Sequence, residues 1–217
     1  MTSPDLARAI AEERGALVEL IAGLDDDQLR TPSLCAGWSV HHVAAHLTMP
    51  FNVSVPGLLW RAMVEPLSFT GAIDRFTQEH ARRPIEGILA QLGDHVADTT
   101  HPPGQPIAPL IDLIVHGEDI CRPLGLERQV RVARIGAALA HLTRGRAIGF
   151  LPGSRVRGLR FVATDADGAW GQGQIVHGPA MDLLLGVMGR RVAFDRLGGA
   201  VHVLRERVDP SAKRTKQ

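Results

Sequence analysis

Apolar residues recur at helical spacing through most of the first 150 residues of the chain. They follow the i, i+3, i+4 pattern that lines one face of an α-helix, and nothing in this part alternates like a strand. The pattern therefore predicts a bundle of about four long helices with shorter extras. We expect helices over residues 5–23, 38–49, 84–99, 107–122 and 131–148, a further helical stretch around 58–64, and either a short helix or a loop over the polar residues 71–82.

The pattern changes after Gly153. Residues 159–164 alternate as in a strand, Asp165–Gly168 reads as a turn, and Ala169–Val176 predicts a second strand. Gly178-Pro179 predicts the start of a helix that Gly189 can end, and Val201–Leu204 fits a last strand. We therefore expect a mainly α protein, with a helical bundle over residues 1–150, a small α+β domain over 154–208 and a disordered basic tail over 209–217.

Composition narrows the classes of protein that this chain can belong to. The 217 residues carry a formal net charge of +1, so no excess charge indicates nucleic acid or an anionic membrane as a partner. Two cysteines make no disulfide framework, and no apolar run is long enough to span a bilayer. Charged residues interrupt the N-terminus, which excludes a signal peptide there. A cytoplasmic location is the resulting expectation.

Asp112 and His116 stand four residues apart in an otherwise apolar predicted helix, and hence on the same face. A buried carboxylate and imidazole are costly unless they are paired, hydrogen-bonded or bound to a metal. The spacing alone leaves two interpretations open: a buried Asp–His hydrogen-bonded pair, or half of a metal site. Asp119, three residues after His116, is placed to orient that imidazole from behind.

The predicted helix over residues 38–49 supplies candidates for a third ligand in His41, His42 and His46. Metal sites in bundles are built from inward side chains on facing helices. Zinc held by two histidines and one carboxylate keeps a fourth position for water or substrate, which is typical of a catalytic site. Cys35 and Cys121 lack a local Cys–His pattern that would mark a nucleophile.

Three separated segments resemble one known family. Residues 31–40 (TPSLCAGWSV) followed by His46-Leu47 are similar to the first motif of the mycothiol-dependent maleylpyruvate isomerase superfamily, which has the DinB/YfiT-like metalloprotein fold. Asp112 with residues 116–119 (HGED) resembles the second motif, and residues 178–190 resemble the C-terminal domain.

The resemblance implies a DinB-like four-helix bundle with a divalent metal, usually zinc, held by His46, Asp112 and His116. The family's isomerase has glutamate where this chain has Asp112, a shortening by one methylene. The family also often has an acidic residue at position 42, which would complete a capping box with Ser39. Here His42 stands there, either as a surface histidine or as an alternative ligand.

The resemblance also implies thiol chemistry of an actinobacterial kind. Mycothiol, a low-molecular-weight thiol, reacts as a thiolate that zinc favours, and adds to the double bond of a small electrophile for isomerisation or S-transfer. Arg190 is our candidate for binding substrate or thiol, although an arginine near a helix C-terminus is also simply favoured by the helix dipole. A non-catalytic bundle that binds a metal or small molecule, and a metal-dependent hydrolase, are the alternative functions. A homodimer is compatible with a bundle of this kind.

Overall fold

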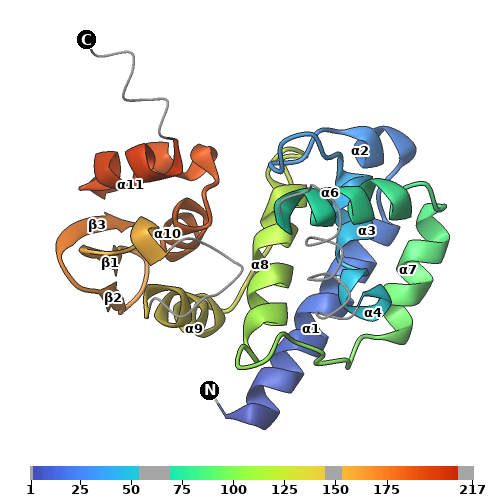
Figure 1. Cartoon of the computed structure of the whole chain (residues 1–217), viewed down its shortest axis with the longest axis horizontal. Helices are drawn as coiled ribbons and strands as arrows, with labels where there is room; N and C mark the ends of the chain where they lie inside the picture. The colour runs from blue at the N-terminus through green and yellow to red at the C-terminus, as the bar shows by residue number, and fades with distance from the viewer. Residues whose placement is uncertain (1, 54–68, 145–152, 210–217) are drawn as a thin grey trace. The chain divides into compact units, whose positions relative to one another are not determined.

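The computed structural model describes residues 2–53, 69–144 and 153–209 (Figure 1). It divides the chain into two compact units, Met1–Gln129 and Val130–Gln217. The helical stretch expected around 58–64, the end of the helix expected over 131–148 and the tail from residue 210 onward lie outside the described residues. Within the described ranges, no helix is long and apolar enough to cross a membrane.

The first unit is a helical bundle built around a buried helix, α8 (Figure 1). Every residue of α8 except Asp112 is buried, and α8 contacts both α1 and α3. The apolar faces that the sequence pattern predicted therefore meet in one core. The helices of this unit are α1 (Ser3–Ala22), α2 (Asp26–Arg30), α3 (Val40–His46), α4 (Met49–Asn52), α6 (Phe69–His80), α7 (Ile85–Asp94) and α8 (Ala108–Cys121).

The start of α3 is fixed by a capping box, which satisfies backbone N–H groups that a helix leaves unpaired at its first turn. The Ser39 side chain accepts from the backbone N–H of His42, and the His42 ring turns back to Ser39, with Nδ1 2.8 Å from its hydroxyl. The predicted N-cap is confirmed, and His42 acts where the family often has an acid. Its other ring nitrogen lies 3.2 Å from the Gln78 side chain on α6.

A buried arginine on α1 holds the chain that follows α7. Arg14 is 4% exposed, and its Nη1 donates to the backbone carbonyls of His95, Val96 and Asp98 at 2.7, 2.7 and 2.8 Å. These carbonyls lie just after the last turn of α7, and the His95 carbonyl also accepts from the Asp98 backbone N–H at 2.9 Å. Burial lowers the pKa of Arg14 from its ordinary value, although the charges of Asp98 and Asp112 act in the opposite direction.

A buried ion pair joins α1 to the segment after α8. The Arg128 guanidinium donates to the Glu13 carboxylate, and both side chains are almost completely buried. Arg128 reaches Glu13 by crossing α8 at Gly117, where an added Cβ would lie 2.7 Å from the guanidinium carbon. Gly117, directly after His116, is therefore required for packing rather than for its backbone conformation.

The described residues of the second unit form three α-helices, two short 3-10 helices and a small sheet. Its sheet has the strand order β2-β1-β3-β4, and β1 pairs antiparallel with β2 but parallel with β3. The α10 helix contacts α9, β1 and β3, so the apolar faces of helices and sheet meet on it. The elements are α9 (Val132–Thr143), η1 (Gly153–Arg155), β1 (Leu159–Ala163), β2 (Ala169–Gly171), β3 (Gln174–Gly178), α10 (Ala180–Val187), η2 (Arg191–Arg196), β4 (Gly198–Gly199) and α11 (Val201–Val208).

The expected mainly α fold, with a helical bundle followed by a small α+β part, is confirmed, but two predicted strands are wrong. The strand expected over Ala169–Val176 is split into β2 and β3. Gly171 and Gly173 have φ values of +78° and +121°, so the chain turns there. The strand expected over Val201–Leu204 is the start of α11, in which Leu204 alone is fully buried.

The division between the units also differs from the expected one. We expected the helix after residue 130 to belong to the bundle, with a boundary near residue 150. Instead α9 groups with the second unit, where it contacts α10 and β2. Helical periodicity shows that a face is buried, but it does not say which element covers that face.

Candidate metal centre

Three side chains from two helices of the first unit converge on one point. His46 is the last residue of α3, and Asp112 and His116 lie one turn apart on α8. The Oδ1 atom of Asp112 lies 3.3 Å from His116 Nε2 and 3.9 Å from His46 Nε2. The three candidate ligand atoms are all within 4.8 Å of one another. The structure thus brings together the three residues that the sequence singled out.

The surroundings of the cluster are asymmetric. The side chains of His46 and His116 are 7% and 10% exposed, whereas that of Asp112 is 27% exposed. A ligand from solvent would therefore approach from the side of the carboxylate, while the imidazoles form the buried part of the cluster.

Both imidazoles are held from behind by hydrogen bonds at Nδ1. His116 Nδ1 lies 2.9 Å from Asp119 Oδ2, and an ionised carboxylate can only accept. His46 Nδ1 lies 3.5 Å from the Thr77 hydroxyl, which itself donates to the Ile73 carbonyl at 3.0 Å. With Nδ1 carrying a proton in each ring, Nε2 is the nitrogen that faces Asp112, and it can either carry a second proton toward the carboxylate or offer its lone pair to a metal.

The electrostatics of the cluster favour a positive charge at its centre. Burial would raise the pKa of Asp112, but the His116 charge and hydrogen bonds from both imidazoles hold it far below its usual range. Burial would lower the pKa of His116, but the charge of Asp112 and hydrogen bonds to Asp112, Asp119 and Cys35 raise it well above its usual value. Either a proton on the imidazole or a cation between the ligand atoms meets this demand.

The loop before α3 contributes two further side chains. Cys35 donates from Sγ to Asp119 Oδ2 at 3.2 Å and lies 3.7 Å from His116 Nδ1. The Trp38 ring is tilted against both imidazoles, with centroid distances of 5.0 Å to His46 and 6.5 Å to His116. No local pattern predicts this position of Cys35, because its partners are more than 80 residues away along the chain.

Residues 10–106 match the family model described as the mycothiol maleylpyruvate isomerase N-terminal domain. This match covers less than half of the chain and supports the resemblance to this family. Two solved structures of the mycothiol-dependent maleylpyruvate isomerase are similar over the whole fold, one of them a mutant: they are 12% and 11% identical, with TM-scores of 0.56 and 0.51. Each comparison covers 92% of this chain and 93% of the other. No curated protein sequence matches the chain.

The matched residues include His46 but end before α8. The placement of Asp112 and His116 beside His46 is therefore an independent observation of the structure. The donor set of two imidazoles and one carboxylate, with the Nδ1 atoms already bonded, fits a divalent metal such as zinc. Metal binding itself stays a prediction.

Arg190, the candidate for substrate or thiol binding, lies in the second unit after α10. It is half-buried, and its Nη1 donates to the Met188 carbonyl at 3.0 Å. Arg155 donates to the neighbouring Val187 carbonyl at 3.1 Å, so two arginines meet the C-terminal end of one helix. This geometry supports the simpler interpretation of Arg190 as a helix-terminal arginine, and the binding role stays a proposal.

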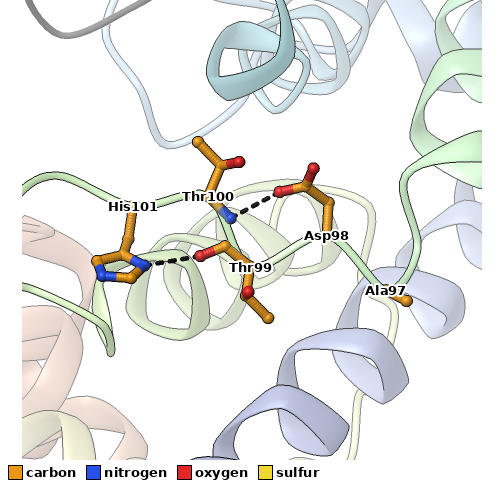
Figure 2. Close-up of a pocket in the computed structure, with 5 residues that line it drawn as sticks. All are labelled: Ala97, Asp98, Thr99, Thr100 and His101. Atoms are coloured by element: carbon orange, nitrogen blue, oxygen red, sulfur yellow. Dashed lines mark hydrogen bonds between the residues drawn. The ribbon is translucent and has the colours of Figure 1, made fainter.

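A shallow surface concavity elsewhere in the first unit does not include the metal cluster. It is lined by Ala97, Asp98, Thr99, Thr100 and His101 (Figure 2). The Thr100 N–H donates to Asp98 at 2.6 Å, and His101 Nδ1 lies 2.8 Å from the Thr99 carbonyl. The polar groups of this loop thus bond to one another, and the loop offers no converging set of chemical groups.

Proposed function

We propose that the protein is a metal-dependent thiol enzyme. In this proposal His46, Asp112 and His116 hold a divalent metal, most suitably zinc, and the cosubstrate is a low-molecular-weight thiol of the mycothiol type. The reaction is isomerisation of, or S-transfer to, a small electrophile. The proposal is supported by the convergence of both Nε2 atoms on Asp112 Oδ1, with each imidazole bonded at Nδ1.

The number of protein ligands supports catalysis over a purely structural site. Structural zinc sites are closed by four protein ligands, whereas catalytic sites use three and keep one position open. When bound, zinc favours deprotonation of a coordinating thiol and so supplies a nucleophile at neutral pH. The half-exposed Asp112 marks the side from which that thiol would enter.

The chain's own residues have distinct roles in this proposal. Asp119 holds the proton at His116 Nδ1, so that Nε2 stays available as a ligand. Thr77 does the same for His46, and Trp38 covers both rings. Arg190 is proposed to bind a carboxylate of the substrate or the thiol.

The metal centre is tested by elemental analysis of the purified protein. We expect about one zinc per chain, and loss of that zinc in His46→Ala and His116→Ala. His42→Ala is the matched control, because His42 lies on the same helix but bonds to Ser39 and Gln78. Full zinc retention in both ligand variants would refute the ligand assignment.

The chemistry is tested by supplying the zinc protein with mycothiol and conjugated electrophiles. Thiol-dependent isomerisation or adduct formation is the expected result, with KM for a dicarboxylate raised in Arg190→Ala. Turnover that does not require thiol would indicate a metal-dependent hydrolase. Zinc binding without turnover of any substrate would leave a bundle that binds metal or a small molecule.

A further inference from the structure

The α6 helix presents three polar side chains to α3 and to the loop before it. Asp74 Oδ1 accepts from the Trp38 indole N–H at 2.7 Å. Thr77, three residues later, bonds to His46, and Gln78 bonds to His42. Positions i, i+3 and i+4 lie on one face of a helix. This face, Asp74–Thr77–Gln78, thus reaches the metal cluster through residues that are not ligands.

Trp38 is the residue through which this face contacts both imidazoles. The imidazole rings of His46 and His116 lie edge to face with their centroids 4.8 Å apart, and the Trp38 indole is tilted against each of them. Its backbone is fixed as well, because the Trp38 N–H donates to the Cys35 carbonyl at 3.0 Å and the Trp38 carbonyl accepts from Ser33 at 2.9 Å. The indole therefore has a defined position against the cluster.

We propose that Trp38, held by Asp74 on α6, is a positioning residue that favours the metal-bound state of His46 and His116. The proposal rests on the proposed metal centre and concerns how firmly that centre holds its ion.

The physical reason is the charge that an imidazole gains when its Nε2 binds a cation. The face of an indole carries negative charge density and attracts a positive partner within about 6 Å of its centroid. His46, at 5.0 Å, lies inside this range and His116, at 6.5 Å, lies just outside it. The indole therefore favours the metal-bound cluster over the neutral one chiefly through His46. Asp74 is exposed, so the hydrogen bond that it accepts acts mainly by fixing the tilt of the indole.

The simpler alternative is that Trp38 only anchors the start of α3 by packing. The two roles differ in a measurable way. A packing anchor lowers the free energy of unfolding of the metal-free protein and leaves the zinc affinity of the folded protein unchanged. A positioning residue lowers that affinity.

The experiment measures zinc dissociation constants of the full-length protein by competition with a chromophoric chelator, together with the unfolding of each metal-free variant. We expect Trp38→Leu to weaken zinc binding about tenfold and Asp74→Ala about threefold. Asp74→Asn, which retains an acceptor oxygen, restores most of the affinity. Glu79→Ala is the control, since Glu79 is exposed on the same helix. Cobalt-loaded protein gives a second readout, because a shifted imidazole changes the visible spectrum of Co²⁺.

Each outcome decides the matter. Lower affinity in Trp38→Leu and Asp74→Ala, with a changed cobalt spectrum and an unchanged Glu79→Ala, supports the proposal. Wild-type affinity in the folded variants overturns it and leaves the metal centre intact. A wild-type protein that binds neither zinc nor cobalt refutes the metal centre and this inference with it. Trp38→Phe and Asp74→Ala serve the same comparison if Trp38→Leu does not fold.

Discussion

Single hydrogen bonds determine which nitrogen of each imidazole is available to a metal. Asp119 accepts a hydrogen bond from Nδ1 of His116, and Thr77 accepts one from Nδ1 of His46. In each ring Nε2 is then the nitrogen that faces Asp112. Asp112 and His116 could be singled out from sequence because a carboxylate and an imidazole are unusual in a buried apolar helix, whereas His46 was chosen among three histidines through the family resemblance. Asp119 could be predicted from its spacing to His116. The contacts of Thr77 and Asp74 could not be predicted, because a polar residue on a largely polar helix does not indicate which side chain it will bond to.

Asp119 therefore has a testable effect on metal affinity. We expect Asp119→Asn to weaken zinc binding by about 10- to 100-fold, because the charged acceptor behind His116 is lost. The measurement is chelator competition at constant pH. Asp94→Asn, which removes an exposed carboxylate at the end of α7, is the control. An unchanged dissociation constant in Asp119→Asn would show that His116 needs no such partner.

The buried Cys121 thiol should be unreactive in the folded protein near neutral pH. Burial raises the pKa of the Cys121 thiol to about 11, with Glu118 adding to the shift and Arg128 opposing it. Only the thiolate is alkylated, so native Cys121 should resist iodoacetamide at pH 8 and become reactive as the pH approaches 11. Peptide mass spectrometry with and without denaturant measures this.

The same shift has a consequence for stability with a definite sign. The pKa of Cys121 in the folded protein lies above the ordinary thiol value of 9.0, so the folded state keeps the proton to a higher pH than the unfolded chain does. The contribution of Cys121 to stability is therefore complete below pH 9 and is lost as the pH rises from 9 to 11. Rapid alkylation of Cys121 in folded protein at pH 8 would contradict both statements.

At the scale of elements, α8 carries the candidate ligands Asp112 and His116. The buried ion pair between Arg128 and Glu13 crosses this helix at Gly117. The sequence predicted α8 well, because an apolar run stopped by Pro123 and Gly125 has one natural helical reading. It did not predict that Arg128 folds back over Gly117 to reach Glu13, since that contact depends on how the bundle is assembled.

Gly117→Ala separates helix propensity from packing. Alanine should stabilise a helix interior by up to about 1 kcal/mol over glycine. Here its methyl group displaces the Arg128 guanidinium and breaks a buried ion pair, which costs about 3–5 kcal/mol. We expect a net loss of about 2–4 kcal/mol in the free energy of unfolding, measured by denaturant titration.

Gly15→Ala in α1 is the matched control, because an added Cβ meets nothing within 4 Å there. It should be neutral or stabilising by up to about 1 kcal/mol. Equal stabilisation of both variants would contradict the prediction, since it would show that the Arg128 guanidinium can move away from residue 117 without lowering the free energy of unfolding.

At the scale of the whole molecule, the cluster of candidate ligands belongs entirely to the first unit. The helices could be predicted from their apolar faces, but the unit to which each helix belongs could not. The α9 helix was expected in the bundle and groups with the second unit. In the second unit, two glycines separate β2 from β3 where the run of residues reads as one strand.

Zinc should stabilise the fold by mass action. At a free zinc concentration 100 times the dissociation constant, the free energy of unfolding rises by about 2.7 kcal/mol. Thermal unfolding in zinc and in chelator measures the shift. His116→Ala should show no such dependence, and an equal shift in that variant would mean that zinc binds elsewhere.

Among the described residues, the contacts around the cluster come from three short stretches, residues 35–46, 74–78 and 112–119. Lengthening a flexible connection between packed helices costs little, about 0.6 kcal/mol for each doubling. The candidate metal centre could therefore be transferred to another protein. A designer could transplant these three stretches onto another set of packed helices with unrelated connections.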